Sequence, residues 1–254
     1  MRTWKKYWIF GTAAALCVPL ADQWGLRDIL YFGVAFYGVG GVYQGIKNNK
    51  PEARSPWVYF FLAISLQFSG ALIQANTDVD GGFGSSLSLA DLFLFSGHVC
   101  LMAALFQFAS KLHQEFPRHG FFQACILAIS LILIGWQFLF LPTIVQYGFS
   151  VNQPQIFRMM YPTMSYMEVG MLLWVWTSSD AYKSRVFTML ALAVIVFAVG
   201  ESFFHGTSSS LGVPNNFNLI LWLWAYVVYG AVALHPDMKR LPVPRVSEEG
   251  SHLN

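Results

Sequence analysis

The feature that most constrains this chain is an uncharged run of 18 residues, Phe217–Leu234, near its C-terminal end. A helix of about this length can cross the roughly 30 Å hydrocarbon core of a bilayer. The run stops at His235, where the following Pro236 disfavours continued helix. Lys239 and Arg240 come next, and such charges collect on the cytoplasmic side of a membrane. We therefore predict a last membrane helix that delivers the chain into the cytoplasm.

The composition indicates that the chain contains several such helices. Of its 254 residues, 56% are hydrophobic and only 11% are charged, whereas charged residues make up about 25% of ordinary soluble domains. The net charge of +2 gives no reason to expect a nucleic-acid partner. Cys17, Cys100 and Cys125 lie in apolar runs without a C-x-x-C spacing, so we expect them to be packing residues. These observations predict an all-α polytopic membrane protein.

The apolar segments give the number of predicted membrane helices. Eight can be read from the sequence, at roughly 7–21, 29–46, 56–75, 87–110, 120–141, 157–177, 186–204 and 217–234. Thirteen of the fifteen Lys and Arg residues fall on alternate connectors, which places both termini in the cytoplasm by the positive-inside rule. We predict a bundle of about eight transmembrane helices over residues 1–241 and a short cytoplasmic tail over 242–254.

Two features of the first segments leave alternatives open. The Lys-rich start, the short apolar run and Val18-x-x-Ala21 also fit a cleaved secretory signal, which would leave seven spans. In the second segment, Gly41 and Gly45 have the G-x-x-x-G spacing that lets helix backbones approach closely. Tight packing against a neighbouring span is the preferred interpretation, and a homodimer face is the alternative.

Five ionisable side chains inside the apolar segments are candidate ligand-binding residues, because such groups are costly in hydrocarbon. They are Asp91, His98, Glu168, Glu201 and His205. The predicted topology puts all five in the outer half of the membrane, on the fourth, sixth and seventh spans. We predict an outward-facing polar pocket for a small ligand, a metal ion or a proton. Pairwise polar contacts that hold helices together are the alternative.

The end of the chain matches the pattern W-x-x-x-Y-x-x-x-G-x-x-A-L-H-P-x-M-[KR]-R-L. The matching residues are Trp222, Tyr226, Gly230, Ala233-Leu-His-Pro236 and Met238-Lys-Arg-Leu241. Weaker matches upstream are Trp57 at the start of the third span, Ser88-Leu-Ala-Asp-Leu92 opening the fourth and Tyr161-Pro162 opening the sixth. In these residues the chain resembles the eight-span N-terminal membrane (sensor) region of bacterial GGDEF and EAL diguanylate cyclases and phosphodiesterases.

This resemblance implies a sensory or signal-transducing module of the bacterial inner membrane. Such a module contacts membrane lipids, takes an unidentified small ligand from the outer side and acts on a cytoplasmic output domain or partner protein. His235 and Pro236 would form the elbow that transmits movement of the last span. Two positions depart from the family pattern: related regions often carry an acidic residue where this chain has Ser165, and Asp where it has Glu201. The resemblance therefore implies no particular ligand or cofactor.

Other functional classes remain as alternatives. Ser202-Phe-Phe-His205 is faintly similar to the pattern of alkaline ceramidases, which suggests an intramembrane metal-dependent lipid hydrolase. The spacing is one residue short, and the paired C-terminal histidines of that class are missing. Imidazole and carboxylate groups such as His98, Asp91 and Glu201 would suit zinc or iron. A structural subunit of a membrane complex also stays open, and no residue is predicted to be catalytic.

Overall fold

A computed structural model describes residues 3–77, 88–112, 118–137, 141, 145, 153–178, 184–206 and 217–240. The predicted tail, 242–254, lies outside these ranges. The described residues contain eight α-helices and no strand. These are α1 (Thr3–Ala21), α2 (Arg27–Asn49), α3 (Arg54–Thr77), α4 (Leu89–Leu112), α5 (Arg118–Gly135), α7 (Gln153–Ser178), α8 (Arg185–Gly206) and α9 (Phe217–Leu234). Two short 3-10 helices are η1 (Asp22–Trp24) and η4 (Pro236–Arg240).

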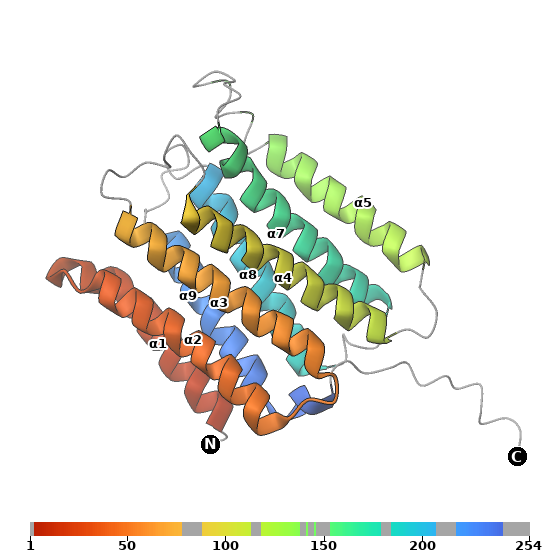
Figure 1. The fold of residues 1–254 in the computed structure, drawn as a ribbon, viewed down its shortest axis with the longest axis horizontal. Coiled ribbons are helices and arrows are strands. Elements are labelled where there is room, and N and C mark those ends of the chain that lie inside the picture. Colours follow the sequence, from red (N-terminus) through yellow and green to blue (C-terminus); the bar gives the residue numbers. More distant parts are fainter. Residues whose placement is uncertain are drawn as a thin grey trace, which may run out of the picture.

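Each of the eight predicted apolar segments coincides with one of these helices (Figure 1). Five of them, α2, α3, α4, α8 and α9, are long and apolar enough to cross a membrane by length and composition. This confirms that the described part of the chain is all-helical and has the character of a multi-pass membrane protein. Some boundaries differ from the predicted ones by several residues: α1 begins at Thr3 instead of near 7, and α7 begins at Gln153 instead of near 157. Tyr161-Pro162 therefore lies inside α7 and does not open it. The first turns of α7 contain polar residues, which apolar patterning cannot recognise as helix.

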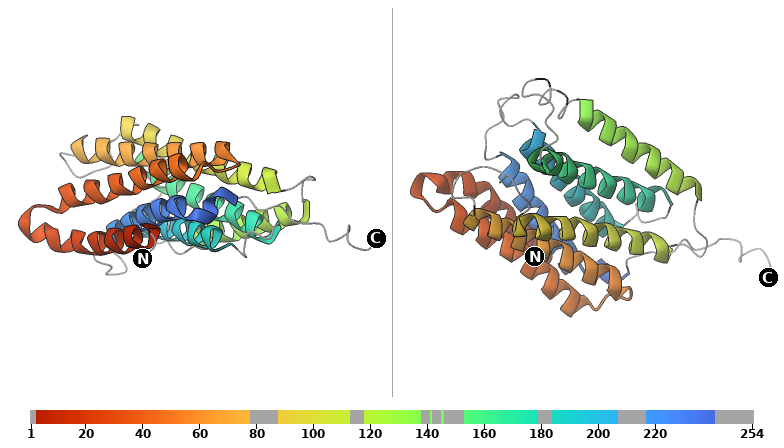
Figure 2. Two further views of the ribbon diagram at one scale, coloured as in Figure 1. Left: turned by 90° about the horizontal axis from the view of Figure 1, so that it is seen from below. Right: turned by 45° about the horizontal axis from the view of Figure 1, so that its top comes forward.

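Six helices form a closed ring. Around it, α2 packs against α3, α3 against α4, α4 against α7, α7 against α8, α8 against α9, and α9 against α2. Figure 2 shows α3 and α4 together as one layer, with α9 and α8 in the other. The remaining two helices lie outside the ring, α5 against α7 and α1 against α2 and α9. The buried face of α1 includes Tyr7, Ala15 and Val18, so the segment that also fits a secretory signal is packed into the bundle.

The last helix is the most enclosed one. Eleven of its 18 residues are buried, because α9 packs against α1, α2 and α8 at once. On the ring side, the Tyr229 ring meets Phe60 of α3 edge-on, with centroids 5.0 Å apart. Trp57, at the start of α3, is fully buried and packs edge-on against Phe60 and Phe108. Aromatic and aliphatic side chains therefore fill the half of the ring next to η4.

Small residues let α2 and α9 approach each other closely. A Cβ atom added at Gly41 would lie 3.0 Å from the Gly230 Cα atom and would collide with the Tyr7 ring. A Cβ atom at Gly45 would collide with the backbone of Ala233. The predicted tight packing against a neighbouring span is confirmed, and that neighbour is α9. A homodimer stays a prediction, although Gly230 and Ala233 of α9 in the same chain pack against Gly41 and Gly45.

This close approach predicts opposite effects for two glycine substitutions on the same helix. We expect Gly45→Ala to lower the free energy of unfolding by about 1–3 kcal/mol, as overpacking does. The backbone of Ala233 cannot move aside as the end of a flexible side chain could. The matched control is Gly40→Ala, because nothing lies within 4 Å of a Cβ atom there. Gly40→Ala should be neutral or slightly stabilising, since alanine favours helix over glycine. Thermal unfolding in detergent would compare the two, and equal effects would contradict the packing.

Candidate functional site

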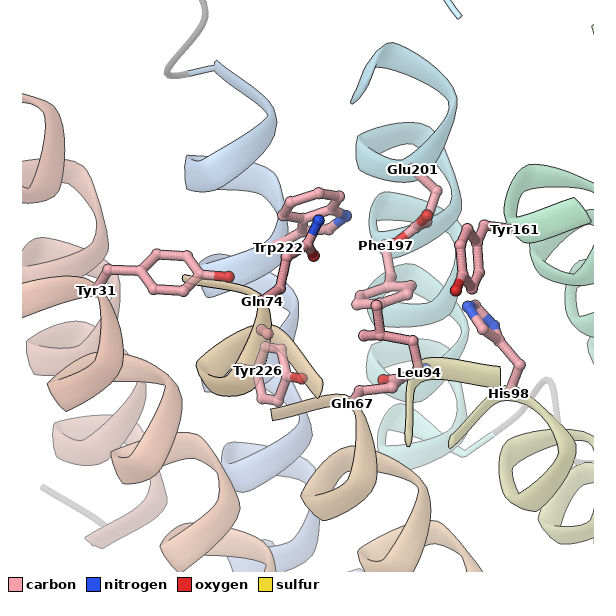
Figure 3. Close-up of a pocket in the computed structure, with 11 residues that line it drawn as sticks. Tyr31, Gln67, Gln74, Leu94, His98, Tyr161, Phe197, Glu201, Trp222 and Tyr226 are labelled. Atoms are coloured by element: carbon pink, nitrogen blue, oxygen red, sulfur yellow. The ribbon is translucent and has the colours of Figure 1, made fainter. Parts of the chain in front are cut away.

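A pocket opens in the ring at the end opposite η4, and all six ring helices line it (Figure 3). It encloses about 510 Å³ of space, its open mouth included. The lining residues come from the first halves of α2, α4 and α7, from the first half and the middle of α9, and from the second halves of α3 and α8. They are Tyr31, Gln67, Ala71, Gln74, Leu94, His98, Tyr161, Phe197, Glu201, Trp222 and Tyr226. The described parts of helices remote in sequence thus form one site.

His98 of α4 and Glu168 of α7 form a buried pair. The His98 Nδ1 atom lies 2.8 Å from the Glu168 Oε1 atom, and each residue is only 1% exposed. His98 lines the pocket and Glu168 does not. The bond from Glu168 fixes the orientation of the His98 imidazole ring. A carboxylate that bonds one ring nitrogen sets the role of the other nitrogen. The two predicted residues therefore act as a unit, with only His98 facing the pocket.

Asp91 also stands behind the pocket wall. The Tyr161 hydroxyl donates a 2.8 Å hydrogen bond to the Asp91 Oδ1 atom, and Tyr161 is the residue that lines the pocket. The other carboxylate oxygen accepts a 2.9 Å bond from the Ser88 backbone N–H, and the Ser88 Oγ atom accepts a 3.1 Å bond from the Asp91 N–H. This reciprocal pair is a capping box at the start of α4. It gives Ser88-Leu-Ala-Asp-Leu92 a structural role and joins it to Tyr161.

Glu201 lines the pocket directly. Its side chain comes from the end of α8, one turn after Phe197, and the residue is 7% exposed. The side chain of His205, on the next turn, lies outside the described part of the chain. Among the residues that are described, no group of three or more His, Cys, Asp or Glu side chains could hold a metal ion. The structure therefore brings His98 and Glu201 to the pocket. Asp91 and Glu168 do not line it, but they bond the lining residues Tyr161 and His98.

Gln67 of α3 is a polar residue of the site that sequence analysis did not select. It is 2% exposed, and within the described chain neither its amide oxygen nor its amide nitrogen has a hydrogen-bond partner. Its stem packs over Gly97, where an added Cβ atom would lie 2.6 Å from the Gln67 Cγ atom. A buried amide without partners is costly. The amide of Gln67 is therefore available to a molecule in the pocket.

The sequence prediction found the α4, α7 and α8 sides of the site and missed the other three. The missed residues are Tyr31 of α2, Gln67 and Gln74 of α3, and Trp222 and Tyr226 of α9. Uncharged aromatic residues are ordinary in membrane helices and do not mark a site by themselves. One usable signal was present, because Gln67 and Gln74 are seven residues apart and so share a helix face.

The elbow after α9 is anchored on two other helices. His235 is 3% exposed, and its ring packs against Trp4 of α1 with centroids 4.6 Å apart. The Asn49 Nδ2 atom, at the end of α2, donates hydrogen bonds of 2.7 Å to the Ala233 oxygen and 3.1 Å to the His235 oxygen. Pro236 is exposed and starts η4, in which Met238 is fully buried. The predicted elbow residues thus form an ordered turn next to the start of α1.

No protein-family model, curated protein or solved structure matches this chain. The resemblance to the sensor regions of GGDEF and EAL proteins therefore stays a prediction.

The His98–Glu168 pair predicts strong coupling between two substitutions. We expect Glu168→Ala to lower the free energy of unfolding by about 1–3 kcal/mol, because a buried imidazole loses its partner. Replacing both residues with apolar ones, His98→Leu with Glu168→Met, should cost less than the sum of the single changes. A double-mutant cycle on thermal unfolding in detergent measures this difference. Additive costs would show that the two side chains do not interact.

The anchoring of the elbow gives a second prediction. Asn49→Leu removes the donor to two carbonyl groups at the end of α9, so amide hydrogen exchange over residues 235–240 should become faster. The matched control is Asn48→Leu, since Asn48 is exposed and its side chain accepts a hydrogen bond from Gln44 of the same helix. Hydrogen exchange followed by mass spectrometry compares both variants with the parent chain. Equal rates in all three would contradict the anchoring role of Asn49.

Proposed function

We propose that this chain is a membrane-embedded sensory module in which a small ligand in the ring pocket shifts the last helix and the elbow after it. The observation that carries the proposal is the position of α9. Its first half lines the pocket through Trp222 and Tyr226, and its last residue leads directly into His235. A ligand can change this helix only by binding one of its arrangements more tightly than the other.

The geometry of α9 suits transmission over a short distance. Nine residues separate Tyr226 from His235, which is about 14 Å at a helical rise of about 1.5 Å per residue. The helix between them is buried and contains no proline, so it would move as a rigid rod. A displacement at the pocket would therefore reach Trp4 and Asn49, which hold the elbow.

The distribution of charge supports the proposed orientation. Lys5, Lys47, Arg54 and Lys239 lie where α1 begins, where α2 ends, where α3 begins and in η4, all at the end away from the pocket. By the positive-inside rule this end faces the cytoplasm and the pocket faces outward. In the proposed topology α1, α5 and α7 also cross the membrane, which gives eight spans with both termini cytoplasmic.

The same proposal implies which faces of the protein contact lipid and which partner receives the signal. Large apolar side chains on the outer faces of α1, α2 and α5, such as Phe10, Ile29 and Ile126, are 51% exposed or more and would contact lipid. The resemblance to GGDEF and EAL proteins supports a bacterial inner membrane and a cytoplasmic output domain or partner protein that receives the movement of η4. A structural subunit is the competing function, and it requires no coupling between pocket and elbow.

Filling the pocket with a side chain tests this coupling without a ligand. Ala71→Phe places a ring in the pocket, and we expect at least a threefold change in amide exchange over residues 235–240. The matched control is Leu72→Phe, which adds a ring at an exposed position one residue further along α3. Hydrogen exchange on the full chain in detergent measures both. An elbow that responds equally to both variants, or to neither, would favour the structural subunit.

A further inference from the structure

The pocket combines a carboxylate with aromatic rings. Glu201 is the carboxylate, and among the described residues neither Lys nor Arg lines the pocket. The aromatic lining residues are Tyr31, Tyr161, Phe197, Trp222 and Tyr226. The Phe197 ring is central among them, with centroid distances of 6.5 Å to both Trp222 and Tyr226. This is the composition of a site that attracts positive charge.

The groups directly behind the wall add to the negative charge. Asp91 bonds Tyr161 and Glu168 bonds His98, so three carboxyl groups lie in or next to the pocket. Among the described lining residues, His98 is the one that can carry a positive charge. The basic residues at this end of the bundle are Arg27, which pairs with Asp22 and Asp28, and Arg158, whose side chain lies outside the described part of the chain. A carboxylate in the pocket wall with two more directly behind it favours a cationic occupant over an anionic one.

The aromatic rings decide which kind of cation fits. Aromatic faces attract organic ammonium groups through the ring quadrupole, and cages of such rings bind quaternary ammonium ligands. An inorganic cation instead needs a shell of oxygen ligands around it.

The buried amide of Gln67 supplies the last element of recognition. Both of its polar atoms are without partners in the described chain, and it lines the same pocket as Glu201. We propose that the pocket binds a small organic ammonium cation, with the charged group among the aromatic rings near Glu201 and a polar substituent bonded to Gln67. This assignment rests on the proposed sensory function for its biological meaning, but the binding itself does not depend on signal transmission.

The experiment compares choline with its neutral isostere 3,3-dimethylbutan-1-ol, which has the same shape without the charge. The full chain is purified in a maltoside detergent without choline lipids, and binding is measured by calorimetry. We expect choline to bind at least tenfold more tightly than the isostere. Glu201→Gln should weaken choline binding at least tenfold. The matched control Glu52→Gln changes an exposed carboxylate at the other end of the bundle and should leave the affinity unchanged.

A second variant keeps the test informative if Glu201→Gln fails to fold. Gln67→Leu should weaken choline at least fivefold and leave tetramethylammonium, which has no hydroxyl group, within twofold of its parent affinity. The assignment is overturned by any one of three results. The isostere binds as tightly as choline, Gln67→Leu affects both cations equally, or neither cation binds with a dissociation constant below about 10 mM.

The same samples separate the ligand class from the sensory function. Amide exchange over residues 235–240 is measured with choline at saturation. Binding of choline without any change at the elbow would support the ligand class and overturn the proposed coupling. Failure of both cations to bind, together with a response of the elbow to Ala71→Phe, would overturn the ligand class alone.

Discussion

The close contact between α2 and α9 is the interaction on which the rest of the structure depends. Gly41 and Gly45 bring α2 against Gly230 and Ala233, so the last helix of the chain closes the ring that α2 begins. Closure has two consequences. The η4 half of the ring becomes a filled aromatic core around Tyr229, and the opposite half becomes an enclosed space that six helices share. If the helices packed side by side without closing a ring, polar groups would be buried in pairs and no such pocket would form.

The polar residues of the ring are arranged in two layers. His98 and Tyr161 face the pocket, and each is held from behind by a carboxylate on a neighbouring helix. Because α4 and α7 each supply one carboxylate and one lining residue, the two bonds fix these helices against each other. A wall held by such supporting contacts is pre-organised for binding. Gln67 differs, since no described side chain satisfies its amide, and that difference marks where recognition of a ligand begins.

The sequence predicted the helices well, because an apolar run that crosses a membrane has few ways other than a helix to hydrogen-bond its backbone N–H and C=O groups. It predicted part of the site for the same reason, since Glu168 and Glu201 are conspicuous in such runs. The partners could not be predicted: His98 and Glu168 are 70 positions apart, and spacing carries no information about which helices become neighbours. Trp222 and Tyr226 were read as part of a motif, and only the closed ring shows that they face the same space as Glu201.

The ring also has a seam that gives the proposed signal a physical route. Tyr7 lodges between Gly41 and Gly230 and bonds the Tyr37 oxygen, so α1, α2 and α9 form one tightly packed unit. The junction between α2 and α3 is the weakest in the ring, whereas α9 packs extensively on α8 as well as on α2. The pocket lies across the α2–α3 junction, because Tyr31 of α2 and Gln67 of α3 both line it. A ligand that contacts both sides would draw α2 and α3 together, and the elbow, which Asn49 of α2 holds, would move with α2.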